Sequence, residues 1–133
     1  MILLDANALM MPVECDVRVF EELDRLVEGV ERGDDGPLAL GVPRAVVAEL
    51  ERLAEGAGEE ATAASVGLDL ARGRCRVLDH EADHGDAAVR ECARRESVTH
   101  AVTNDAALKR ELLARGVPVI SLRAGNKLAV TQP

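Results

Sequence analysis

Three aspartates stand where apolar segments begin or end, at positions from which their side chains could meet. Asp5 directly follows the apolar run Ile2-Leu3-Leu4, and Asp105 directly follows a second short apolar segment. Asp86 lies near the start of the amphipathic stretch that precedes this second segment. Carboxylates about 4 Å apart repel by about 4 kcal/mol at an effective dielectric of about 20, so gathered acids either raise their pKa values or bind a cation. Oxygen-only ligands favour Mg²⁺ or Mn²⁺, and such a site suits phosphodiester hydrolysis.

The hydrophobic pattern predicts the elements that would position these aspartates. Short apolar runs predict strands at residues 2–4, 38–42, 75–78, 99–102 and 117–122. Helical spacing predicts helices at residues 16–31, 59–71, 83–95 and 106–115, with a further helix opening at Pro43. Five strands separated by helices are typical of an α/β fold with a parallel sheet covered on both faces. We expect a single domain over residues 1–133, with its site at the carboxyl ends of the strands.

Each aspartate also has a purely structural interpretation. Asp105 has the position of an N-cap for the helix beginning at Ala106, Asp83 and Asp86 have the spacing of a capping pair, and Asp5 could form a turn. At about 100° per residue, Asp86 falls within the apolar stripe of its helix, whereas Asp83 points away from it. A carboxylate on a buried helix face is costly without a compensating charge. We therefore interpret Asp83 as the cap and Asp86 as the functional residue.

The charge pattern bears on the partners of the protein. A formal net charge of −8 argues against a nucleic-acid partner, because phosphate binding relies on Lys and Arg. However, the chain has 2 Lys against 14 Arg, Phe20 is its only aromatic residue, and acidic residues occur throughout. This composition resembles that of proteins from salt-loving cells, where an acidic surface maintains solubility, and net charge of this origin says little about substrate. The alternative is an ordinary acidic protein that never meets nucleic acid.

Neither targeting signals nor cysteines predict export. The apolar opening at residues 1–13 is interrupted by Asp5 and has no basic residue ahead of it, which argues against a signal peptide or membrane span and favours a cytoplasmic protein. Cys15, Cys75 and Cys92 are odd in number and lack a CxxC pair. They predict reduced, mostly buried thiols rather than disulfides or a zinc site.

Four motifs occur in an order that resembles a known family. They are Asp5-Ala6-Asn7 after the first strand, Ala48-Glu49-Leu50 on a helix, Gly85-Asp86-Ala87-Ala88-Val89, and Val102-Thr103-Asn104-Asp105-Ala106-Ala107-Leu108-Lys109. From Ile2 to about Leu122, the chain resembles PIN domains. The resemblance implies a three-layer α/β fold around a parallel five-stranded sheet. It also implies endoribonuclease activity on single-stranded RNA that depends on Mg²⁺ or Mn²⁺.

The resemblance also implies the site residues. It places metal-binding and catalytic carboxylates at Asp5, Glu49, Asp86 and Asp105, supported by hydrogen bonds from Asn7, Thr103 and Asn104. Periodicity alone does not select Glu49, because Glu51 lies equally far to the other side of the apolar helix face. Two departures stand out: Ala6 replaces the Thr of many relatives, and Ala107 replaces an acidic residue found in some, which would weaken the binding of one metal ion.

Within the family, the segment 17–26 and Lys109-Arg110 resemble archaeal relatives of ribosomal-RNA-processing nucleases more than VapC-type toxins. An RNA substrate fits both groups. An antitoxin or a ribosome-assembly partner, and a homodimer, are left open. The main alternative is a catalytically weak PIN-like module that binds RNA or assembles a ribonucleoprotein.

Two other enzyme classes fit the pattern poorly. Haloacid-dehalogenase-type phosphatases need a second Asp where Asn7 stands, and response-regulator receivers need an acidic pair near the start and a Lys after a late strand. Asp5 stands alone, and Lys109 lies inside a predicted helix. The histidines, which are His80, His84 and His100, do not have the spacing of a metal site. The alternating arginines before the third strand are interpreted as a solvated charge run, with contact to RNA phosphate as the alternative: Arg72, Arg74 and Arg76.

Overall fold

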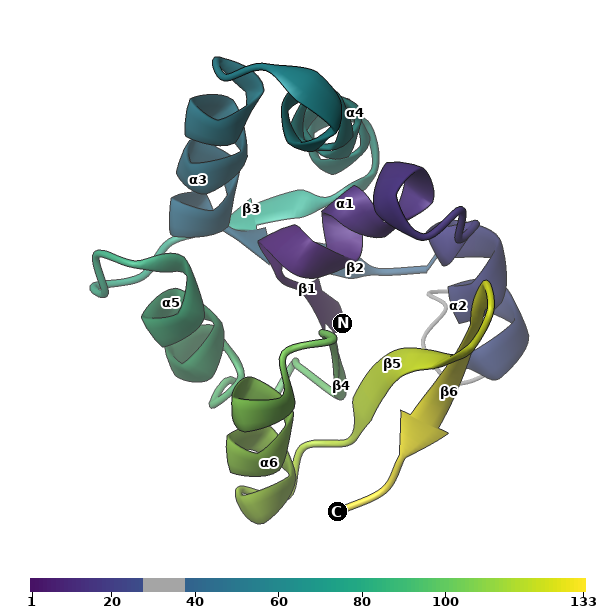
Figure 1. Cartoon of the computed structure of the whole chain (residues 1–133). Coiled ribbons are helices and arrows are strands. Elements are labelled where there is room, and N and C mark those ends of the chain that lie inside the picture. The colour runs from purple at the N-terminus through teal and green to yellow at the C-terminus, as the bar shows by residue number, and fades with distance from the viewer. Residues whose placement is uncertain (28–37) are drawn as a thin grey trace.

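The computed structural model describes residues 1–27 and 38–133, and within them six strands form one sheet (Figure 1). The strands are β1 (Ile2–Leu4), β2 (Leu40–Pro43), β3 (Arg76–Leu78), β4 (His100–Val102), β5 (Val119–Ala124) and β6 (Lys127–Thr131). The helices are α1 (Ala6–Glu14), α2 (Val19–Leu26), α3 (Arg44–Ala54), α4 (Gly58–Arg74), α5 (Gly85–Cys92) and α6 (Ala106–Ala114). The strand order is β3-β2-β1-β4-β5-β6. The predicted α/β class with a mostly parallel sheet is confirmed.

The direction in which the chain crosses the sheet reverses between β1 and β4. From β1 the chain moves outward to β2 and β3, and it then returns past β1 to β4 and β5, with every one of these pairs parallel. The register places Leu4 beside Val102, so β1 and β4 end at the same level. Open α/β sheets bind their ligands at such a reversal, outside the carboxyl ends of the strands. Asp5 and Thr103 are the first residues beyond these two ends.

The central strand is also the most apolar. Ile2, Leu3 and Leu4 have no exposed surface, as expected for a strand that is covered on both faces. The neighbouring strands add Val42 and Val102 to the same core. Because the core extends to the last residue of β1, Asp5 reaches the edge of the sheet while still inside the protein.

Two groups of helices pack on the sheet. Helices α1–α4 connect strands on the way from β1 to β3, and α5 and α6 connect strands in the opposite direction, from β3 to β4 and β5. Because such crossovers are right-handed, connections that run in opposite directions lie on opposite faces of the sheet. Helices α1–α4 therefore lie on one face, and α5 and α6 lie on the other. Helix α1 packs against α4, α4 against α3, and α5 against α6. Figure 1 shows α1, α3 and α4 in the upper part of the view and α5 with α6 at the lower left. The groups meet where α3 contacts α5, the two helices that carry Glu49 and Asp86.

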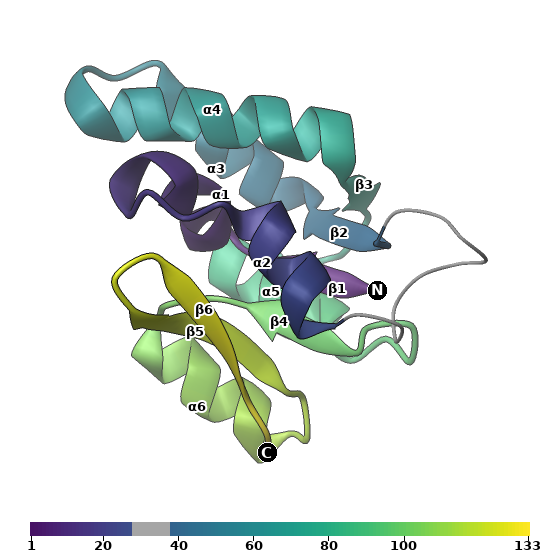
Figure 2. The same cartoon turned by 90° about the vertical axis from the view of Figure 1, so that its right-hand side faces the viewer.

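The sheet has one strand more than the five predicted. Strand β6 pairs antiparallel with β5 through a turn at Gly125, whose φ is +56°. This strand was missed because only Leu128 of its five residues is buried. Helix α2 lies against β6 (Figure 2). The buried Glu22 of α2 holds the strand, because its Oε1 accepts the Leu128 backbone N–H at 2.9 Å and the Arg25 guanidinium donates to both of its oxygens.

The helices differ from the prediction in several places; α4, for example, covers Gly58–Arg74 rather than 59–71. Helix α1 was not predicted, because most of its length is buried and it therefore lacks the polar face that reveals helical periodicity. Helix α2 begins at Val19 and ends at Leu26, whereas 16–31 was predicted, and residues 28–31 of that prediction lie outside the described residues. Helix α5 covers Gly85–Cys92 rather than 83–95.

Two expectations about the chain as a whole can be compared with the structure. None of the described helices is long and apolar enough to cross a membrane. The three cysteines are free thiols: Cys92 is buried, and Cys15 and Cys75 are half-buried.

Candidate active site

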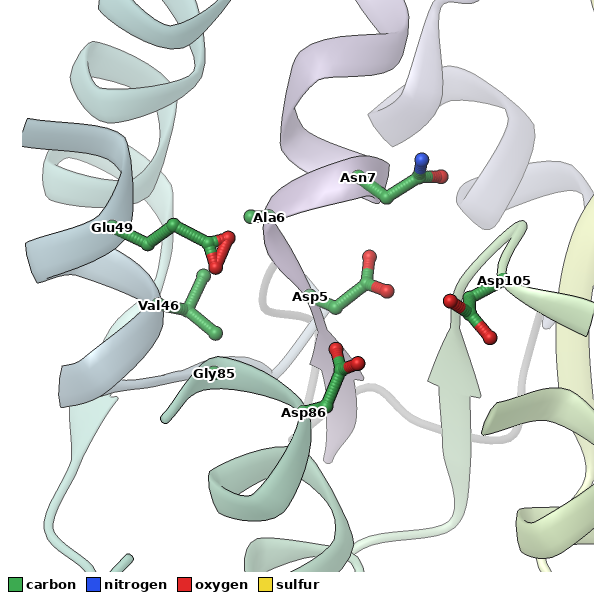
Figure 3. A pocket seen from close by; sticks show the side chains of 8 residues that line it. All are labelled: Asp5, Ala6, Asn7, Val46, Glu49, Gly85, Asp86 and Asp105. Atoms are coloured by element: carbon green, nitrogen blue, oxygen red, sulfur yellow. The ribbon is translucent and has the colours of Figure 1, made fainter. Parts of the chain in front are cut away.

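The four carboxylates of the predicted site line one pocket of about 100 Å³ (Figure 3). It opens at the carboxyl ends of β1 and β4, where the crossover direction reverses. Asp86 points toward Asp5, Asp105 faces them from the β4–α6 junction, and Glu49 reaches in from α3. The complete lining consists of Asp5, Ala6, Asn7, Val46, Glu49, Gly85, Asp86 and Asp105.

Asp5 is a buried acid with an unusual protonation equilibrium. Its side chain caps α1, because Oδ1 accepts the Ala8 backbone N–H at 2.7 Å, and the residue is only 5% exposed. Burial raises the pKa of Asp5 to about 7, with smaller increases from the charges of Asp86 and Glu49. Hydrogen bonds from the Thr103 hydroxyl and the Ala8 N–H oppose this rise without cancelling it. No basic residue in the described part of the chain is among the groups that shift this pKa.

Asp105 combines the two roles that its position in the sequence allowed. Its Oδ1 accepts the Leu108 backbone N–H at 2.8 Å and so caps α6. The same side chain lines the pocket from the exposed side. Capping uses one carboxylate oxygen, which leaves the second free to face the other acids. The structural and functional interpretations of Asp105 are therefore compatible.

The expectations for Asp83 and Asp86 need correction. No described side chain caps α5: the N-cap residue is His84, so the capping role predicted for Asp83 is wrong. Asp86 does line the pocket, but it is exposed rather than on a buried helix face. The helix begins at Gly85, so Asp86 lies in a first turn that projects beyond the buried part of the helix. The loop before α5 is instead held by Glu91, whose carboxylate accepts the backbone N–H groups of residues 81 and 82.

Glu49 and Glu51, which periodicity could not separate, have different surroundings. Glu49 lines the pocket, and its pKa is raised by burial and by the nearby charge of Asp86, while Arg52 acts in the opposite direction. Glu51 is exposed and pairs with Arg72 at 3.7 Å. The pocket thus contains the glutamate that the family resemblance indicated.

The three predicted supporting residues connect the strand ends behind the pocket. The Thr103 hydroxyl is fully buried and accepts the Asp105 backbone N–H at 3.0 Å, in addition to its hydrogen bond with Asp5. Asn7 Oδ1 accepts the Asn104 backbone N–H at 3.2 Å, and Asn104 Oδ1 accepts the Leu122 N–H at 2.8 Å. These bonds tie the end of β4 to the start of α1 and to β5, which fixes the separation of Asp5 and Asp105.

The pocket residues are of the type that bind a hard divalent cation, because their ligand atoms are oxygens. Four carboxylates and the amide of Asn7 offer only oxygen to a metal at this edge. Asp5 has the raised pKa of a buried acid without a counter-charge. In residues 1–27 and 38–133, no three His, Cys, Asp or Glu side chains stand close enough together to enclose one ion. A cation that keeps several water ligands, as Mg²⁺ does, does not require direct bonds from all four acids.

Other residues considered from the sequence lie outside the pocket. His80 accepts the Ala45 backbone N–H through Nε2 at 2.9 Å, so it supports the start of α3. The alternating arginines are exposed, and Arg74 stacks on the ring of Phe20 at 4.3 Å. Gly85, which belongs to one of the four motifs, also lines the pocket, a position that sequence spacing does not reveal.

The protein has an acidic pocket at the point where the crossover direction of a parallel α/β sheet reverses, and known proteins share this sequence pattern and fold. The family described as "PIN like domain" matches residues 2–125, and this chain belongs to that family. A solved structure titled "Structure of the PIN domain endonuclease Utp24" shares the fold, with a TM-score of 0.77 and 21% sequence identity. The similarity covers 99% of this chain and 91% of that one. No curated protein matched the sequence.

Proposed function

We propose that this protein is a metal-dependent endoribonuclease that hydrolyses phosphodiester bonds of single-stranded RNA, in ribosomal RNA processing or as a VapC-like toxin. The observation that carries the proposal is the convergence of four carboxylates on one pocket, one of them buried with its pKa raised to about 7. Membership of the PIN-like family and a fold shared with a PIN domain endonuclease support it.

The residues of the pocket would bind the metal ion, hold the Asp5 carboxyl group in one orientation and allow it to carry a proton. Asp5, Glu49, Asp86 and Asp105 would hold Mg²⁺ or Mn²⁺, which when bound activates water and neutralises charge on the phosphate oxygens. The Ala8 N–H and the Thr103 hydroxyl fix the orientation of the Asp5 carboxyl group. Near neutral pH and without a cation, Asp5 is close to half-protonated, because its pKa is about 7. The pocket lining of the described chain contains no Ser, Cys or His that could act as a nucleophile, which favours water in that role.

The preference for single strands follows from access. The pocket is small, about 100 Å³, and lies at the edge of the sheet between α1, α3, α5 and the start of α6. A phosphate in a flexible strand can turn into this pocket, whereas one in a duplex is fixed by pairing on both sides. We therefore expect folded RNA to resist cleavage.

Labelled single-stranded RNA incubated with Mn²⁺ or Mg²⁺ tests the proposal. The variants are Asp105→Asn and, as a matched control, Asp83→Asn, which changes an exposed aspartate outside the pocket. Asn retains an oxygen that can cap α6, so Asp105→Asn should keep the fold. We expect Asp105→Asn to lose activity by at least about 100-fold, in the range of lost metal-site interactions, while Asp83→Asn retains most of it. A chelator should abolish cleavage by the wild type.

The assay is run at several salt concentrations, because an acidic, Lys-poor surface indicates adaptation to high salt. If the wild type and Asp105→Asn are equally inactive on many RNAs, the alternative of an RNA-binding or assembly module becomes the better interpretation. If Asp83→Asn is the inactive variant, the choice between the two aspartates is wrong.

A further inference from the structure

Gly85 occupies a position where the backbone does not require glycine. It is the first residue of α5, directly before Asp86. Its φ is not positive, in contrast to Gly58, Gly116 and Gly125. In a helix, Ala is ordinarily preferred to Gly. The space around Gly85 offers a reason for glycine at this position.

That space is taken by one carboxyl group. A Cβ atom added to Gly85 would lie 2.9 Å from Oε1, 3.7 Å from Cδ and 3.8 Å from Oε2 of Glu49, and these are its three nearest heavy atoms. The contact at 2.9 Å is shorter than van der Waals contact allows, so the carboxylate would have to move. Other crowded glycines meet the core instead: a Cβ at Gly41 would strike Met1, and one at Gly67 would strike the backbone of Leu9.

We infer that Gly85 is a positioning residue for Glu49: its missing side chain leaves the room in which the Glu49 carboxylate reaches the pocket. Glu49 comes from α3 and has to cross to the start of α5 to join Asp86. A methyl group on Gly85 would fill that crossing point. The displaced group would be the Glu49 carboxylate, which is the end of a flexible side chain. The substitution should therefore change the stability of the fold little, while the site loses one metal ligand. The inference rests on the proposed function for its effect on metal binding, although not for the position of Glu49.

The test compares Gly85→Ala with Gly73→Ala, a helical glycine of α4 around which an added Cβ meets no atom within 4 Å. Crystal structures of wild type and Gly85→Ala show where the Glu49 carboxylate lies. Calorimetric titration with Mn²⁺ gives the metal affinity, and chemical denaturation gives the stability. We expect Gly85→Ala to displace Glu49, to weaken Mn²⁺ binding by about tenfold, and to unfold no more easily than wild type. Gly73→Ala should leave Mn²⁺ affinity unchanged.

A double-mutant cycle with Glu49→Ala isolates the coupling. In the Glu49→Ala background, adding Gly85→Ala should cause no further loss of Mn²⁺ affinity. An equal loss in both backgrounds, an unmoved Glu49 carboxylate, or a Gly85→Ala protein that fails to fold would each overturn the inference. A wild type that binds no Mn²⁺ would instead overturn the proposed function, and the crystal structures would still decide whether Gly85 positions Glu49.

Discussion

Replacing Asp5 by Asn should make the metal-free protein more stable at alkaline pH. The pKa of Asp5 is about 7 in the folded protein against an ordinary 3.8. When folding raises the pKa of an acid, the folded protein is most stable at a pH below the unfolded pKa, where the acid is protonated in both states. This stability is lost as the pH rises through the folded pKa, because the acid must then ionise inside the folded protein. The difference from 3.8 to about 7 corresponds to about 4 kcal/mol of lost stability at pH 8. Asn cannot ionise and retains an oxygen that can accept the Ala8 N–H.

The assay is thermal unfolding in chelator at pH 4, 6 and 8, with Asp83→Asn as the control. At about 3 °C per kcal/mol for a domain of this size, Asp5→Asn should melt about 10 °C above wild type at pH 8, with the gap closing toward pH 4. Adding Mn²⁺ should raise the melting temperature of wild type and not that of Asp5→Asn, because a ligand of the folded state stabilises it. Parallel melting curves for the two proteins from pH 4 to 8 would refute the reasoning, since Asp5 would then carry no uncompensated buried charge.

Two further predictions concern the frame around the site. Glu22→Gln should lower stability by about 2 kcal/mol at neutral pH; because the pKa of Glu22 is lowered to about 2, the difference from wild type should disappear as pH falls from about 4.5 to 2 in denaturation experiments. An undiminished difference at pH 2 would contradict this. His80→Ala removes the acceptor of the Ala45 N–H and should cost about 1 kcal/mol, whereas His84→Ala should be neutral in the same measurement. Equal losses would contradict the role of His80.

The parts of the fold with strong periodic signals could be predicted from the sequence. The fully apolar β1 and the Asp5 that follows it indicated the edge of the sheet at which the candidate site lies. Helix α1 escaped prediction because burial on most sides removes amphipathic spacing. Strand β6 escaped because only Leu128 of its five residues is buried, and its hydrogen bond to Glu22 joins residues far apart in the chain.

In the candidate site, too, some residues could be predicted from the sequence and others could not. Asp5 is the first residue after β1 and Asp105 the third after β4, so parallel pairing of these strands places both at the same edge of the sheet. Asp86 lines the pocket as predicted, although it is exposed rather than on a buried helix face, and Asp83 is not the cap. Helical spacing could not choose between Glu49 and Glu51, since the choice depends on how α3 sits against α5 and on the ion pair of Glu51 with Arg72.

The four pocket carboxylates are spread along the chain at positions 5, 49, 86 and 105, each on a different segment. A nascent chain that has emerged only as far as β4 therefore has the scaffold of the central strands but lacks Asp105 and the α6 start that orients it. If the protein cleaves RNA as proposed, this spacing delays the activity until Asp105 and the start of α6 have left the ribosome. Until then, the messenger and ribosomal RNA closest to the growing chain would be exposed to an incomplete enzyme.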